Sequence, residues 1–307
     1  MNPQDAIGFT AVLGAVAWAG AGRANSADAY TVADRSIGLW PLVATLVMTE
    51  FNTSTLLAFS AAGYGAGPMA IALPAVFLVG LLFYTVSVAK AWKRFNRLSV
   101  AELFAVRYSP ALGRCASALL LLAMAGFSAT YVKSLTVIFT PFAPSWSPWA
   151  WSAGLTGIVL LVVVRGGLPS VVRADQVGFV LTVVLLPTLC WLGWRALPAT
   201  GLAAAFPESQ RTFDPVAQWR HPALPFRFVT SLMVLTCVTY IAAPWYGQKI
   251  FAARDERTAY RAVGLSALLV FALYGATVLA AAAYRAAAPP LADAQAVVPA
   301  MLTAWFP

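Results

Sequence analysis

The sequence predicts an all-α polytopic membrane protein, and three observations carry the prediction. Hydrophobic residues make up 61% of the 307 residues, whereas charged residues make up 10%. Apolar stretches of about 20 residues, the length of a helix that crosses a bilayer, recur along the whole chain. No low-complexity segment interrupts them. We therefore expect a single transmembrane domain over residues 1–307.

Eight spans are expected, with boundaries uncertain by a few residues. They are residues 6–22, 39–63, 68–89, 115–140, 149–164, 176–197, 226–247 and 262–284. The first span lacks the basic start and the cleavage site of a signal peptide, since only Asp5 precedes it. It is therefore expected to remain as a helix.

The basic residues predict how the chain lies in the membrane. If the amino terminus is outside, the inward loops carry fourteen Lys and Arg residues, Lys249 among them, against five on the outward side. This bias predicts a multi-pass protein of the inner or plasma membrane with its amino terminus outside. The net charge of +9 then faces anionic lipid of the bilayer, and no nucleic-acid partner is expected.

The second span holds the strongest candidate site because a carboxylate lies near its centre. Glu50 is followed closely by Asn52, Thr53, Ser54 and Thr55. An ionisable side chain at membrane depth indicates function by default, and hydrogen-bonding side chains compete with the helical backbone. We expect the helix to break between residues 48 and 55 and to offer backbone groups to ions and solutes. The alternative is a regular helix in which Glu50 is paired or protonated.

The third span contains no hydrogen-bonding side chain from Met69 to Phe83. A sugar site needs many such groups, because each buried hydroxyl left unpaired costs about 1–3 kcal/mol. A sugar is therefore disfavoured as a substrate.

The fourth span carries a second polar cluster, which includes Tyr131 and Lys133. Lys133 lies within about two turns of the outer end, so its ammonium can reach the membrane surface. Alternatively it pairs with Glu50, which requires both residues to lie at similar depth.

The fifth span is the shortest of the eight.

The seventh span is a second candidate for a broken helix, because Pro244 and Gly247 can open its end before it leaves the membrane. Its polar residues Thr236, Thr239 and Tyr240 would line or gate a cavity.

Enzyme motifs are absent from the sequence. It contains no GxSxG, no P-loop, no HExxH and no Cys/His cluster. We therefore expect no enzymatic activity and no organic cofactor.

Five short motifs, in this order and spacing, resemble the sodium/solute symporter family, which includes the relatives of the sodium/glucose and sodium/proline cotransporters. They are residues 28–38, the polar break with residues 59–65, and residues 99–108, 165–176 and 248–254. The resemblance extends over nearly the whole chain.

The resemblance implies a leucine-transporter-like core of ten helices in two inverted repeats, preceded by one extra amino-terminal helix. Spans two to eight then correspond to core helices one to seven. A sodium ion is implied at the backbone carbonyls of Met48 and Phe51, with an acidic or amide position at Glu50. Asp175 is implied as an ion-path aspartate.

By the same resemblance, the chain stops in an external loop after core helix seven. Core helix eight, which supplies further sodium ligands in the family, is absent. We expect that either a longer protein or a second polypeptide supplies the missing carboxyl-terminal half.

The leading hypothesis is a secondary active transporter, a sodium-coupled symporter of a small polar solute that works by alternating access. The solute-binding residues expected are Glu50, Asn52, Thr53, Ser54, Thr55, Tyr131, Thr236, Thr239 and Tyr240. Because Glu50 attracts an amine, an amino acid or other nitrogenous metabolite is favoured. The alternatives are a membrane sensory module of the same fold, attached to a signalling domain, and a proton-coupled carrier that uses Glu50 or a Glu50–Lys133 pair.

Overall fold

The computed structural model describes residues 3–142 and 145–305, and this part of the chain contains helices and no β-strand. It divides into two compact units. The first comprises Met1–Thr49, Leu82–Val180 and Thr239–Ser266, and the second comprises Glu50–Leu81, Leu181–Val238 and Ala267–Pro307. Each unit is described by itself below.

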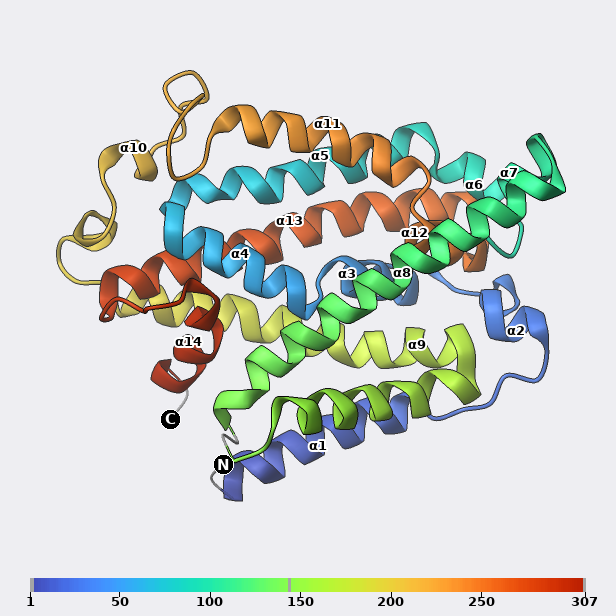
Figure 1. Ribbon diagram of the computed structural model, residues 1–307, viewed down its shortest axis with the longest axis horizontal. Coiled ribbons are helices and arrows are strands. Elements are labelled where there is room, and N and C mark those ends of the chain that lie inside the picture. The colour runs from blue at the N-terminus through green and yellow to red at the C-terminus, as the bar shows by residue number, and fades with distance from the viewer. Residues whose placement is uncertain (1–2, 143–144, 306–307) are drawn as a thin grey trace. The chain divides into compact units, whose positions relative to one another are not determined.

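The amino-terminal half of the chain forms eight α-helices in the described residues (Figure 1). They are α1 (Pro3–Gly20), α2 (Ala27–Val32), α3 (Leu39–Glu50), α4 (Thr53–Ala66), α5 (Ala72–Ser87), α6 (Ala89–Phe95), α7 (Glu102–Arg107) and α8 (Pro110–Phe139). Three short 3-10 helices, Ala33–Arg35, Gly67–Ile71 and Thr140–Phe142, follow α2, α4 and α8.

The carboxyl-terminal half continues with α9 (Pro148–Arg195), α10 (Glu208–Arg211), α11 (Phe226–Ile241), α12 (Pro244–Ala252), α13 (Glu256–Ala287) and α14 (Val297–Trp305). Two 3-10 helices, Gly201–Ala204 and Ala294–Ala296, lie in its loops. α9 is two helices joined across Gly167, whose φ of 57° is non-helical. A Cβ at Gly167 would lie 2.5 Å from the Tyr30 carbonyl oxygen, so only glycine fits this kink.

Four helical stretches in the described residues are long and apolar enough to cross a membrane: Thr53–Ser87, Pro110–Phe139, Val163–Arg195 and Glu256–Ala287. The bent pair of α11 and α12 would be a fifth. Shorter apolar helices cover Thr10–Gly20, Leu39–Glu50, Pro148–Leu161 and Ala294–Trp305. Each of the eight expected spans thus contains helix, and the arrangement as eight spans stays a prediction.

The helix of the second expected span is broken, as the polar run predicts. α3 ends at Glu50 and α4 begins at Thr53, and the chain between these two labelled helices can be followed in Figure 1. Asn52 has an extended backbone, with φ −119° and ψ 173°. The alternative of a regular helix through Glu50 is therefore wrong.

The helix of the seventh expected span is broken as well. α11 ends at Ile241, and Pro244 is in the first turn of α12, because proline has no N–H to continue a helix but fits its first turn. The expected part of Gly247 in this opening is wrong. Gly247 is helical and buried in α12, and a Cβ there would lie 2.3 Å from Val100 Cγ2, so this glycine permits close packing.

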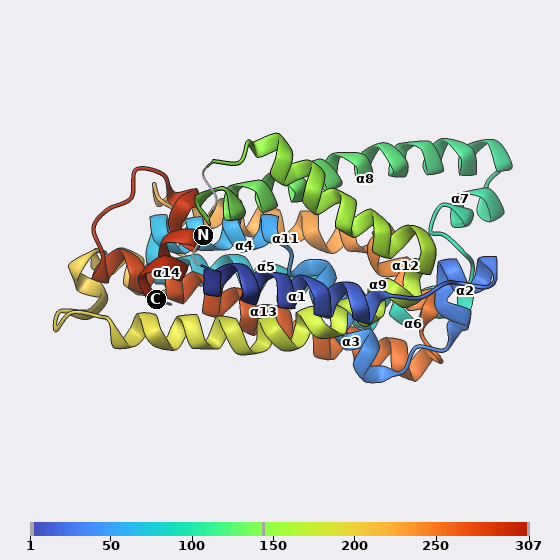
Figure 2. The same ribbon diagram turned by 90° about the horizontal axis from the view of Figure 1, so that it is seen from below.

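Backbone pairing in the first unit ties the segment before α3 to the end of α12. Ile37 donates its N–H to the Ala252 carbonyl at 3.1 Å and accepts the Arg254 N–H at 2.9 Å. The Lys93 ammonium on α6 donates to the Phe251 carbonyl at 2.9 Å. Within this unit α12 contacts both α2 and α6, and the three helices lie near one another in Figures 1 and 2. These bonds hold α3 and α12 together independently of their membrane-depth side chains.

Candidate functional site

The break in the second unit is organised around one carbonyl oxygen. The backbone carbonyl oxygen of Glu50 accepts hydrogen bonds from the Tyr274 hydroxyl at 2.5 Å, the Asn52 N–H at 3.0 Å, Asn52 Nδ2 at 3.1 Å and Thr55 Oγ1 at 3.0 Å. The carbonyls of the last turn of a helix have no N–H partner within that helix. These four donors satisfy the Glu50 carbonyl and fix the chain at the point where the helix stops.

Asn52 and Thr55 form a capping box at the start of α4. The Thr55 N–H donates to Asn52 Oδ1 at 3.1 Å, and the Asn52 N–H donates to Thr55 Oγ1 at 3.0 Å. Such reciprocal bonds satisfy N–H groups that a helix start leaves without partners. Both residues thus have a structural part in the break, and their contact with a solute stays a prediction.

Tyr274 of α13 is the residue of this break that sequence reasoning missed. Its side chain is fully buried, and its ring lies 4.0 Å from that of Phe59, 5.3 Å from Phe51 and 5.4 Å from Phe77, between centroids. The only sequence signal is a tyrosine in the middle of an apolar span, which by itself does not identify its partner.

Replacing Asn52 with alanine is expected to lower the free energy of unfolding by about 1 kcal/mol, because the cap of α4 is lost. Thermal unfolding of the purified protein in detergent measures the change. Asn52→Asp keeps an oxygen for the Thr55 N–H but loses the Nδ2 donor to the Glu50 carbonyl, so it is expected to retain only part of the stability. The matched control is Ser54→Ala, in the first turn of the same helix, and equal losses in Asn52→Ala and Ser54→Ala would contradict the capping role.

A second polar centre lies in the first unit, where Lys249 and Asp175 form an ion pair. Lys249 Nζ is 3.2 Å from Asp175 Oδ2, and the two side chains are 11% and 21% exposed. Lys249 Nζ also donates to the Thr45 carbonyl at 2.7 Å, to Thr45 Oγ1 at 2.6 Å and to Thr49 Oγ1. Three helices, α3, α9 and α12, therefore meet at one ammonium group.

Lys249 corrects one expectation drawn from charge. From the sequence, Lys249 is expected as one of the basic residues of the inward loops, but it is buried in α12. Lys249 lies five residues after Pro244 in α12, and no local sequence signal marks it as buried. Removing it from the inward group leaves the excess of basic residues on that side unchanged in sign.

The residues expected to bind sodium are distributed as follows. Met48 lies in the last turn of α3, and its Cε is 3.3 Å from where a Gly178 Cβ would lie, one turn from Asp175 on α9. Phe51 follows α3 directly and is buried, and its carbonyl accepts no hydrogen bond from the described residues. The structure places Asp175 against an ammonium group of the chain itself.

The remaining expected site residues are placed as follows. Thr53 and Ser54 are half-buried in the first turn of α4, and Thr236 is half-buried on α11. Thr239 is exposed, whereas Tyr240 is buried with its ring 5.5 Å from that of Tyr246. Tyr131 is half-buried, 6.4 Å from the Phe127 ring.

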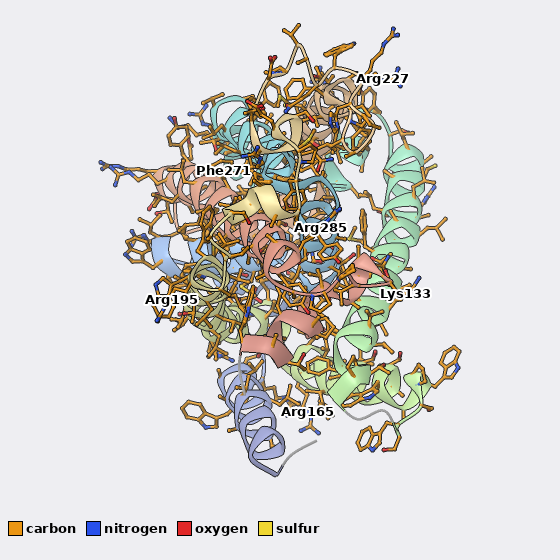
Figure 3. All side chains as sticks on the ribbon, turned by 90° about the vertical axis from the view of Figure 1, so that its left-hand side faces the viewer. Lys133, Arg165, Arg195, Arg227, Phe271 and Arg285 are labelled. Carbon is orange, nitrogen blue, oxygen red and sulfur yellow. The ribbon has the colours of Figure 1, made fainter. Side chains whose placement is uncertain are left out.

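Lys133, labelled in Figure 3, is exposed on α8 and forms no ion pair within the described residues. Its exposure fits the interpretation in which its ammonium reaches the membrane surface. Its pairing with Glu50 stays a prediction.

A hollow of about 620 Å³ lies elsewhere, lined by Lys93, Arg94, Asn96, Asp255, Glu256 and Arg257. Burial lowers the pKa of Lys93, and the Thr258 N–H lowers the pKa of Asp255 by donating to its carboxylate. Both signs of charge are present, and Arg94 and Glu256 pair at 2.9 Å. The hollow contains none of the residues around the two helix breaks.

Comparison with known proteins gives consistent results. The model of the Sodium:solute symporter family matches residues 30–304. The chain is 27% identical over 277 residues to the sodium/pantothenate symporter of Escherichia coli (strain K12), covering 85% of this chain and 55% of that protein. It is 24% identical over 290 residues to the sodium/pantothenate symporter of Haemophilus influenzae, covering 91% and 58%. The chain thus spans little more than half the length of these curated relatives.

Among solved structures, the chain is similar to a Na⁺-coupled sialic acid symporter in a substrate-bound outward-open state, with a TM-score of 0.83 and 15% sequence identity. The match covers 97% of this chain and 65% of that one. At this identity the likeness shows the fold.

Proposed function

The chain belongs to the sodium:solute symporter family, and from this premise we propose that it forms the amino-terminal part of a sodium-coupled symporter. The transporter moves a small polar solute across the membrane by alternating access. It is a multi-pass membrane protein, which we place in the inner or plasma membrane with its amino terminus outside. The rest of the transporter is supplied by further sequence or by a second polypeptide.

The observation that carries the proposal is the ordered break between α3 and α4. Interrupted helices at membrane depth are tolerated where they line a cavity or bind ligands. This break is held by a capping box and by the Tyr274 hydroxyl, so the chain stabilises an irregular backbone beside the buried Glu50. Random loss of helix in an apolar span would not recruit these donors.

We assign the coupling ion to the end of α3. Sodium prefers oxygen ligands, and carbonyls at the end of a half-helix supply them with a favourable partial negative charge. The carbonyls of Met48 and Phe51 are the proposed ligands in this chain. The Glu50 carbonyl is excluded as a ligand, because its four hydrogen-bond donors already surround it.

The solute proposed is an amino acid or a similar nitrogenous metabolite. The Glu50 carboxylate attracts an amine, and a sodium ion beside it offsets its repulsion of a substrate carboxylate. The named relatives are sodium/pantothenate symporters and the structural neighbour is a sialic acid symporter. Both compounds are carboxylates whose nitrogen is an uncharged amide, so they support a carboxylate solute, and the amine rests on Glu50 alone. Thr53 and Ser54 supply further hydrogen bonds, and Thr236, Thr239, Tyr240 and Tyr131 line or gate the path.

Uptake into proteoliposomes tests the function. The complete protein is reconstituted, and accumulation of radiolabelled pantothenate, sialic acid and individual amino acids is compared under inward gradients of sodium, choline and protons. We expect one solute to accumulate only under the sodium gradient. Accumulation driven equally well by protons favours the proton-coupled carrier, and binding of a solute without accumulation favours the sensory module.

The Glu50→Gln variant is expected to abolish uptake while the protein stays folded, because the amide keeps the size of the side chain and loses its charge. The matched control is Glu208→Gln on α10, an exposed carboxylate whose loss is expected to leave uptake unchanged. Gel filtration and helical circular dichroism check that both variants fold. Wild-type uptake kinetics in Glu50→Gln would remove the proposed role of this residue.

A further inference from the structure

The environment of Lys249 has the composition of a cation site. Four oxygens surround its ammonium: the Thr45 carbonyl, the Thr45 and Thr49 hydroxyls and the Asp175 carboxylate. These are the uncharged and carboxylate oxygens with which proteins bind hard metal cations. The set carries one formal negative charge, which matches a single positive charge.

The hydrogen bonds inside this site run in one consistent direction. The Thr45 hydroxyl donates to Asp175 Oδ2, and the Thr49 hydroxyl donates to the Thr45 carbonyl at 2.7 Å. Both hydroxyl hydrogens therefore point away from Lys249, and both oxygens present lone pairs to the ammonium. A metal cation at the same point would need these same orientations.

The positions of the surrounding oxygens do not depend on the Lys249 side chain. Thr45 and Thr49 come from consecutive turns of α3, and Asp175 comes from α9. The backbone pairing of Ile37 with Ala252 and Arg254 holds α3 beside α12 through main-chain atoms alone. A shorter or uncharged side chain at position 249 thus leaves the oxygens in place and removes the group that fills the space between them.

We propose that Lys249 is a tethered cation that occupies an oxygen-lined ion site and keeps free sodium from it. Asp175, in consequence, balances the charge of the chain's own ammonium instead of a transported ion. Lys249 thereby sets how many sodium ions the protein binds. This inference rests on the proposed sodium-coupled function and specifies the ion stoichiometry of that transporter.

Equilibrium binding of radioactive sodium to the purified complete protein in detergent tests the proposal. Lys249→Met keeps an apolar stem as far as Cε and removes the ammonium group, and we expect it to bind one sodium ion more per molecule than the wild type. Lys249→Arg retains the charge and is expected to bind the wild-type number. Combining Lys249→Met with Asp175→Asn removes the carboxylate and is expected to abolish the additional ion.

Thermal unfolding gives a second readout that does not depend on a high yield of folded variant. For each protein, the Tm in sodium chloride is compared with the Tm in choline chloride, at a sodium concentration a hundredfold above its Kd. This difference is expected to be about 5 to 10 °C larger for Lys249→Met than for the wild type. If Lys249→Met folds poorly in choline chloride, sodium is expected to raise its folded yield. The proposal is overturned if Lys249→Met binds the same number of sodium ions as the wild type, or if its Tm is the same in the two salts. It is also overturned if Asp175 takes up a proton in place of sodium.

The outcome is separable from that of the proposed function. Sodium binding and uptake by the wild type test the symporter itself. The difference between Lys249→Met and the wild type tests the tethered cation. A wild type that binds no sodium beside a variant that binds one ion would support the inference and contradict the proposed symport.

Discussion

Replacing Asp175 with alanine is expected to lower the free energy of unfolding by about 3 kcal/mol, because it leaves the Lys249 ammonium buried without its carboxylate. The loss falls at the lower end of the range for broken buried pairs, since a fifth of the Asp175 side chain is exposed. The Thr45 and Thr49 oxygens remain and solvate the ammonium in part. None of them carries a charge to balance it.

A double-mutant cycle in choline chloride separates this pairing from the other contacts of the two residues. Asp175→Ala, Lys249→Met and their combination are unfolded thermally in detergent. The double variant is expected to be more stable than the sum of the single losses predicts, since it buries no unpaired charge. Strict additivity would show that the pair contributes nothing as a pair.

The control for this cycle is the exposed pair of Arg94 and Glu256, whose side chains are 68% and 40% exposed. Water and salt screen charges in such a position. Glu256→Gln is therefore expected to leave the Tm unchanged, although its ion pair at 2.9 Å is the shorter of the two.

Replacing Gly63 with alanine is expected to lower the free energy of unfolding by about 3 kcal/mol, near the upper end of the usual range for overpacking. A Cβ on Gly63 of α4 would lie 2.3 Å from the Val278 carbonyl oxygen and 2.8 Å from Val278 Cα on α13. Both obstructing atoms are backbone, so no side-chain rotation relieves the clash. The two helices must move apart, and dispersion contacts along their interface are lost.

Gly65→Ala on the same helix is the matched control, because a Cβ there meets no atom within 4 Å. Alanine also favours the helical backbone over glycine by about 1 kcal/mol, so Gly65→Ala is expected to be neutral or slightly stabilising. The measurement is thermal unfolding in detergent. A Gly63→Ala protein as stable as Gly65→Ala would show that α4 and α13 do not need this close approach.

The fold class and the family were predictable from sequence, and both are confirmed by the match to the symporter family and by the likeness to a solved symporter. The break after Glu50 was predictable too. Asn52 and Thr55 can hydrogen-bond a backbone that leaves the helix, and this property is local to four or five neighbouring residues. The second break was predictable from Pro244, because the missing N–H of a proline is also a local property.

The partners of these residues were not predictable. Tyr274 donates to the Glu50 carbonyl across 224 positions of sequence, and Lys249 pairs with Asp175 across 74. Lys249 follows an apolar span, and such a lysine has the same local pattern whether it reaches water or turns inward. Only the packing of α3, α9 and α12 distinguishes the two cases.

The sequence by itself determined that this is a helical membrane protein with a polar interruption within residues 48–55, because hydropathy and capping act over a few neighbouring residues. The tertiary structure alone decided which groups satisfy that interruption, and that the cation beside Asp175 is a lysine of the same chain. The physical reason is that a buried charge or carbonyl takes the nearest complementary group in space, and nearness in space is set by the packing of helices far apart in sequence.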